Sequence, residues 1–182
     1  MATMDEERIE PQEALASPRG GGYARGRRIM RGASRSRKEG GVRCHSTRLG
    51  EFEAKEEQIF LLPDGLIGFP QYREFCMIEL ERRPRIELLQ SLDDPRLGFC
   101  LVQPEHFFPD YRLSLPPKEF DLLSVTRKEE IETWVIVTFH RDPFRVTANL
   151  QAPLLLNRKE RIGRQIVLRE LPYHTRHLLI EE

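Results

Sequence analysis

The acidic pair Asp93-Asp94 is the first group in the sequence whose residue types could do chemistry. Two neighbouring carboxylates can share a proton and act as an acid and a base. Successive side chains of a strand point to opposite faces, however, so the pair could form such a dyad only in an unusual turn. Pro95 follows directly, and aspartate side chains often bond the backbone of turns. We therefore interpret Asp93-Asp94 as part of a turn and not as a catalytic dyad.

Histidines and cysteines are the other candidates for chemistry. His174 and His177 have a spacing that could ligate a metal on a helix, but neither an HExxH motif nor a cysteine pair accompanies them. Cys44, Cys76 and Cys100 have no CxxC spacing, and the last two fall in expected strands, where a reduced thiol behaves as a small apolar group. The sequence also lacks a GxSxG nucleophile motif. We expect no catalytic residues, no metal site and no cofactor.

A cluster of aromatic side chains follows the acidic turn. Phe107, Phe108 and Tyr111 lie close together, with Asp110 among them. Three aromatic side chains cannot all be exposed at low free-energy cost, so the segment either folds back onto a sheet or forms a contact patch. An acidic rim around such a patch suits a basic protein partner and repels nucleic acid. The predicted protein-binding residues are Asp93, Asp94, Phe107, Phe108, Asp110 and Tyr111.

Short strands are the elements that must position these residues. Residues 133–139 (TWVIVTF) are apolar on both faces, which is typical of a central strand or of a barrel wall. Residues 86–92 and 97–102 predict a hairpin around the acidic turn. Residues 118–124 predict one short helix, and residues 173–182 a peripheral tail or short turn. About eight to ten short strands predict an all-β, mostly antiparallel domain, either a small barrel or a sandwich.

The charge of the chain is divided unevenly along its length. Residues 1–45 carry 10 Lys and Arg against 6 acidic residues, whereas residues 46–182 carry 19 against 23. Residues 1–43 are rich in Arg and Gly, so we expect a disordered basic extension before a β-domain over residues 44–182. We favour a solvated tail, or sequence upstream of the true start codon. The alternative function is an RNA-binding regulator that acts through this tail, since clustered arginines displace counterions from phosphates.

Membrane insertion and secretion have no support in the sequence. A spanning helix needs about 18 or more consecutive apolar residues, and no such run occurs. The residues after Met1 also lack the apolar core of a signal peptide. We therefore expect a cytoplasmic protein that makes no membrane contact.

Several motifs resemble those of the flagellar assembly factor FliW family, in the family's order and over roughly Thr47 to His177. They are residues 63–69 (PDGLIGF), 89–95 (LQSLDDP), 107–111 (FFPDY), 147–153 (TANLQAP) and 163–166 (GRQI). The sequence departs from the family at Ile67, where proline is frequent, and at Leu178, which follows Arg176-His177 where proline is common. The family has no counterpart of residues 1–42.

The resemblance implies a small barrel-like fold and a function without catalysis. FliW-like proteins bind the translational repressor CsrA and hinder its binding to the leader of flagellin messenger RNA, an inhibition described as allosteric. They also bind flagellin itself. Free flagellin occupies the FliW-like protein and releases CsrA, which stops further flagellin synthesis. The expected partners of this chain are therefore flagellin and a CsrA-type regulator, with no direct contact between the β-domain and nucleic acid.

Overall fold

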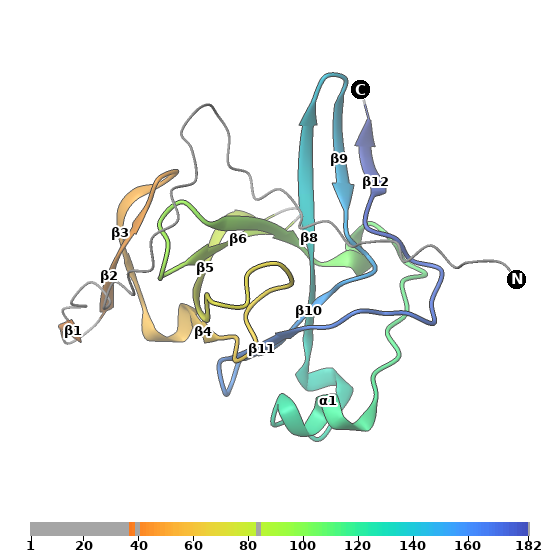
Figure 1. Ribbon diagram of the computed structural model, residues 1–182, viewed down its shortest axis with the longest axis horizontal. Coiled ribbons are helices and arrows are strands. Elements are labelled where there is room, and N and C mark those ends of the chain that lie inside the picture. The colour runs from red at the N-terminus through yellow and green to blue at the C-terminus, as the bar shows by residue number, and fades with distance from the viewer. Residues whose placement is uncertain (1–36, 39–40, 83–84, 182) are drawn as a thin grey trace, which may run out of the picture.

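The computed structural model describes residues 37–38, 41–82 and 85–181 of the 182-residue chain. Strands dominate these residues, and a single short α-helix accompanies them (Figure 1). The expected all-β, mostly antiparallel fold with one short helix is confirmed. The extension expected over residues 1–43 lies outside the described residues except for strand β1 (Arg37–Lys38) and residues 41–43, which begin strand β2 (Gly41–Ser46).

Nine strands form one sheet that closes on itself. In sheet order they are β10 (Leu154–Asn157), β11 (Ile162–Gln165), β4 (Ile59–Leu61), β5 (Glu74–Arg82), β6 (Arg85–Ser91), β7 (Gly98–Val102), β8 (Glu132–Arg141), β9 (Phe144–Ala148) and β12 (His177–Glu181). Strand β10 also pairs with β8, so the strands from β10 to β8 form a near-complete ring. The β11–β4 pair is parallel, and the other pairs of the sheet are antiparallel. The barrel-like form of the prediction is therefore the one observed.

Strand β8 belongs both to this ring and to an arm that projects from it. In its first half Trp134 pairs with Leu154 of β10, and in its second half Val137 pairs with Ala148 of β9. The other edge of β9 pairs with β12. In Figure 1 the strands β8, β9 and β12 stand side by side and rise beyond the ring. The tail or short turn expected over residues 173–182 is therefore wrong, because β12 completes this arm.

The sheet buries apolar side chains on both of its faces. Along β8, Trp134 and Ile136 belong to an inner cluster, whereas Val135 and Val137 belong to an outer one. The inner cluster fills the ring and consists of Phe60, Leu62, Leu66, Phe75, Met77, Leu89, Leu97, Phe99, Leu101, Trp134, Ile136, Leu154 and Leu156. The outer cluster consists of Leu88, Cys100, Val102, Val135, Val137, Val146, Ala148 and Leu150. Residues 133–139 thus form a barrel wall with two covered faces, as their composition predicts.

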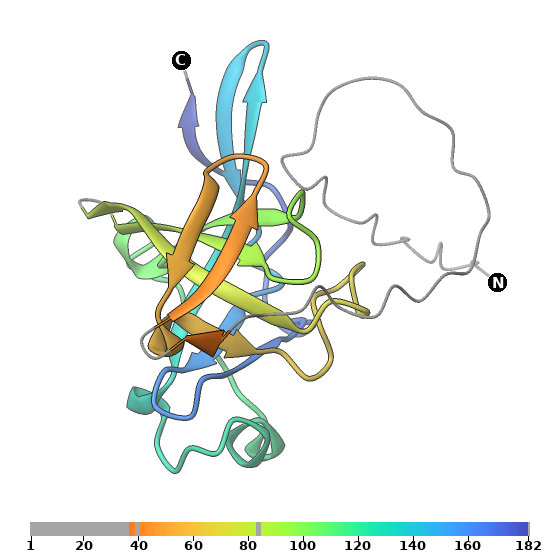
Figure 2. The same ribbon diagram turned by 90° about the vertical axis from the view of Figure 1, so that its left-hand side faces the viewer.

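Smaller elements cover the remaining sides. Strands β2 and β3 (Gly50–Ala54) form a hairpin that lies over one side of the main sheet (Figure 2). The helix α1 (Pro117–Leu122) begins at a proline, which the first helical position accepts because its N–H would be unpaired anyway. Short 3₁₀ turns are η1 (Glu56–Gln58), η2 (Pro104–His106) and η3 (Lys128–Glu130).

The three cysteines are free thiols, as their spacing predicts. Cys76 and Cys100 are buried, and Cys44 is half-buried. Burial raises the pKa of the Cys76 thiol to about 12, so this group stays protonated and unreactive at neutral pH.

Candidate partner-binding surface

The aromatic segment after β7 lies against the outer face of the sheet. Phe107, Phe108 and Tyr111 are half-buried and pack on the outer cluster. The hydroxyl of Tyr111 donates a hydrogen bond to the carbonyl oxygen of Leu150 at 3.1 Å. Burial raises the pKa of Tyr111, which keeps this hydroxyl protonated and able to donate. The segment therefore folds back onto the sheet, and only part of each ring is open to a partner.

Residues at the start of β12 and just before it hold the aromatic segment from the other side. The ring of Tyr173 lies 4.7 Å from that of Tyr111, and the ring of His177 meets Phe108 edge-on at 5.8 Å. His174 stacks on His177 with 3.7 Å between the ring centroids, and Nε2 of His177 accepts a hydrogen bond from the backbone N–H of His174. Burial, together with His174, lowers the pKa of His177. The histidine pair thus serves packing between the aromatic segment and β12.

Asp110 is the acidic residue of the aromatic segment, and its side chain is fully exposed. Its carboxylate lies 3.9 Å from Nη2 of Arg112, whose own side chain is also mostly exposed. Such a pair contributes little to stability in water. The carboxylate of Asp110 is therefore open to a partner.

Asp93 and Asp94 lie at the opposite end of β7, where they build the turn. The carboxylate of Asp94 accepts hydrogen bonds from the guanidinium of Arg96 at 2.9 and 3.0 Å, and these bonds lower the pKa of Asp94. Oδ2 of Asp93 accepts a hydrogen bond from the backbone N–H of Arg73 at 3.2 Å. Because β7 is five residues long, roughly 17 Å separates this acidic turn from the aromatic segment. The structure therefore places the six predicted residues on two separate surfaces.

A third surface lies on the arm and consists of Phe139, Phe144 and Ile180, here named the arm patch. Phe139 pairs with Val146 of β9, which in turn pairs with Ile180 of β12, so these side chains share one face. The exposed fractions are 37% for Phe139, 39% for Phe144 and 47% for Ile180. The patch continues the outer cluster toward the tip of the arm. Sequence reasoning missed it because β12 was not predicted, although the apolar run of β8 extends to Phe139.

The residues that the structure describes contain neither a metal-binding cluster nor a membrane-spanning helix. These residues contain no group of three or more His, Cys, Asp or Glu side chains that could hold a metal ion. Within the same residues, no helix has both the length and the apolar composition needed to cross a bilayer.

Comparison with known proteins identifies the family. The model of the FliW protein family matches residues 43–179. The chain belongs to the FliW family. The flagellar assembly factor FliW of Geobacillus kaustophilus is 37% identical over 134 residues, which are 73% of this chain and 92% of that protein. The FliW of Thermotoga neapolitana is 34% identical over 139 residues, which are 76% of this chain and 93% of that protein.

A solved FliW structure has the same fold. The crystal structure of a flagellar assembly factor FliW superposes with a TM-score of 0.70 at 34% sequence identity, covering 77% of this chain and 98% of that one. The resemblance read from the sequence motifs is therefore confirmed. FliW proteins are flagellar assembly factors and not enzymes, which agrees with the expectation that this chain has no catalytic residues.

Proposed function

We propose that this FliW-family chain is a cytoplasmic flagellar assembly factor that works as a partner switch. It binds a CsrA-type translational repressor, which leaves flagellin messenger RNA free for translation. It also binds flagellin, and free flagellin displaces the repressor, which then stops further synthesis. The family match over residues 43–179, together with the fold of a solved FliW, is the observation that carries this proposal.

The aromatic segment and the arm patch support one protein-binding surface. Both border the outer cluster, so exposed apolar groups occur at either side of the same buried face. Apolar and aromatic side chains on such a surface are the usual source of binding free energy between proteins. Phe107, Phe108, Asp110 and Tyr111 would contribute from the aromatic segment, with the exposed Asp110 facing a basic group of the partner.

The acidic turn supports a second surface. Asp93 is exposed. Hydrogen bonds from Arg96 lower the pKa of Asp94, so the Asp94 carboxylate stays negatively charged at neutral pH. A basic partner would be attracted to this end of β7. Because the two surfaces lie at opposite ends of one strand, negative coupling between the partners explains a switch better than overlap of their footprints.

Calorimetric titration of the full chain with purified CsrA-type repressor and with monomeric flagellin tests the proposal. Each protein alone should bind, and saturating flagellin should weaken repressor binding by about tenfold or more, which corresponds to ~1.4 kcal/mol of coupling. Failure of both proteins to bind would overturn the proposal. So would a ternary complex in which the repressor binds with undiminished affinity.

Two variants at partly exposed apolar residues locate the surface. Phe139→Ser removes an arm-patch side chain, and Leu122→Ser removes a side chain that is 46% exposed on α1, at the other end of the molecule (Figure 1). If the arm patch binds a partner, Phe139→Ser should cost on the order of 2 kcal/mol of binding free energy. Leu122→Ser should leave both affinities unchanged. Equal effects of the two variants would exclude the arm patch as a specific surface.

Direct RNA binding is the outcome that would favour the alternative function. A full-length variant with the arginines of residues 1–36 replaced by glutamine should bind flagellin and the repressor as the unmodified chain does. If the unmodified chain instead bound RNA tightly at low salt, and the variant did not, the arginine-rich segment would be the functional element.

A further inference from the structure

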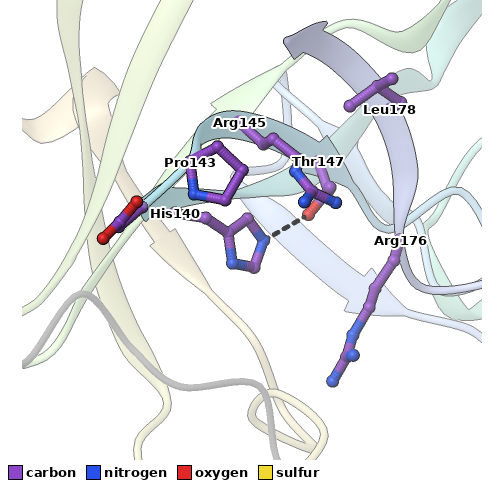
Figure 3. Close-up of a pocket in the computed structure, with 7 residues that line it drawn as sticks. His140, Pro143, Arg145, Thr147, Arg176 and Leu178 are labelled. Atoms are coloured by element: carbon purple, nitrogen blue, oxygen red, sulfur yellow. Dashed lines mark hydrogen bonds between the residues drawn. The ribbon is translucent and has the colours of Figure 1, made fainter. Parts of the chain in front are cut away.

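An open pocket of about 420 Å³ lies on the face of the arm that is opposite the arm patch. Its lining residues are His140, Asp142, Pro143, Arg145, Thr147, Arg176 and Leu178 (Figure 3). Side chains alternate between faces along a strand, so His140 points away from the face that carries Phe139. The register pairs His140 with Arg145, and Thr147 with Leu178, which brings these side chains together.

The floor of the pocket carries hydrogen-bonding groups. Thr147 is 9% exposed, and its hydroxyl lies 3.1 Å from Nε2 of His140 (Figure 3). Arg145 extends from the same strand two residues before Thr147 and lies across from Glu181 of β12 in the register. A hydroxyl, an imidazole and a guanidinium therefore converge on one side of the arm.

Arg176 supplies the charge that this group of residues can offer to a ligand. It directly precedes β12, is exposed, and its side chain extends away from the ribbon (Figure 3). Among the residues described, its guanidinium forms no ion pair. A guanidinium fork matches the geometry of a carboxylate or a phosphate. Pro143 and Leu178, which is 49% exposed, add apolar walls beside it.

We propose that this pocket binds a carboxylate side chain of an acidic, partly apolar protein segment. Asp142 is the one carboxylate in the lining, and it would repel a phosphate dianion more strongly than a single carboxylate. Residues 46–182 carry 19 basic and 23 acidic side chains, a balance that disfavours a polyanion such as RNA. The apolar walls suit a peptide in which leucine-like residues accompany the acid. The site lies on the opposite face from the arm patch and does not depend on the partner switch.

Nuclear magnetic resonance titration of the ¹⁵N-labelled full chain tests this site with a defined probe. The probe is the capped peptide Ac-(Leu-Glu)₃-NH₂, and Ac-(Leu-Gln)₃-NH₂ is its uncharged counterpart. The glutamate peptide should shift the amide resonances of Arg145, Thr147, Arg176 and Leu178, and the glutamine peptide should not. Arg176→Gln should weaken binding about tenfold, the usual effect of losing one charge-assisted hydrogen bond.

Arg141→Gln is the matched control, because Arg141 follows His140 on β8 and pairs with Phe144 on the opposite face. This variant should bind the glutamate peptide with unchanged affinity, and the amide spectrum of each variant reports whether it is folded. Equal binding of the two peptides, or unchanged binding by Arg176→Gln, would overturn the proposal. It would also be overturned if inorganic phosphate or a uridine hexanucleotide shifted the same amides at lower concentration than the glutamate peptide.

Discussion

The hydroxyl of Tyr111 provides a sharp test of whether the aromatic segment is part of the core or a free binding element. Tyr111→Phe removes only the group that donates to the carbonyl of Leu150, a residue that is 1% exposed. A hydrogen bond of this kind contributes about 1 kcal/mol net to stability. For a domain of this size, 1 kcal/mol corresponds to about 2–4 °C in Tm. Tyr111→Phe should therefore lower Tm by about 2–4 °C.

Tyr111→Ala should destabilise the fold more than Tyr111→Phe does, because it also removes the ring. The contact with the ring of Tyr173 at 4.7 Å contributes about 1 kcal/mol, and the half-buried ring contributes a similar amount through its packing on the outer cluster. The total loss is about 3 kcal/mol, or roughly 6–12 °C in Tm. Thermal unfolding followed by circular dichroism measures both variants.

Tyr72→Phe is the control, because the hydroxyl of Tyr72 lies 3.4 Å from Oδ2 of Asp94, at the limit of a hydrogen bond. Its Tm should change by less than about 2 °C. Calorimetry with flagellin, at a temperature where each variant is folded, separates stability from binding. If Tyr111→Phe kept the Tm of the unmodified chain but bound flagellin tenfold more weakly, the hydroxyl would serve a partner and the packing argument would be refuted.

Three further predictions concern stability. Gly65→Ala should lower the free energy of unfolding in urea by about 3 kcal/mol, because φ of Gly65 is +66° and an added Cβ would lie 2.6 Å from a loop carbonyl oxygen. Gly50→Ala should lower it by about 1 kcal/mol, because φ of Gly50 is +74° but no atom lies within 4 Å of the added Cβ. Equal losses would contradict the steric argument. Arg158→Met should lower the free energy of unfolding by about 2 kcal/mol, because the partly exposed guanidinium of Arg158 donates hydrogen bonds to the carboxylate of Glu132 on β8 at 2.7 and 2.8 Å and lies 4.0 Å from buried Glu87. Adding Glu87→Gln to this variant should restore part of the loss in the same urea assay, because the side chain buried at position 87 then carries no charge. The Tm should fall as pH decreases from 7.5 to 5.5, because the pKa of His177 is lowered in the folded state. In the unfolded chain this histidine has its ordinary pKa of about 6.5, so the unfolded chain takes up the proton more readily and is favoured at lower pH. His177→Gln should flatten this dependence, and an unchanged slope would assign it to other groups.

The sequence by itself determined the local structure and the family. The β-branched and aromatic run at residues 133–139 can be buried on both faces only within a sheet, and it forms the shared strand β8. Asp93-Asp94 followed by Pro95 forms the turn between β6 and β7, where the carboxylate of Asp94 accepts a hydrogen bond from the backbone N–H of Arg96 two residues on. The motifs that resemble FliW follow from sequence alone, since a pattern of residue types can be compared without any coordinates.

Tertiary structure decided which of these residues meet. Residues 177–181 carry the apolar run Leu178-Leu179-Ile180, which is too short to predict a strand by itself, and β12 forms where β9 offers an edge to pair with. The acidic turn and the aromatic segment are near in sequence, yet the extended strand β7 places them at opposite ends. The pocket around Arg176 arises from two distant parts of the chain that the β9–β12 pairing brings together. Strand pairing depends on partners far away in the sequence, so it is fixed by the free energy of the whole sheet and not by local residue preferences.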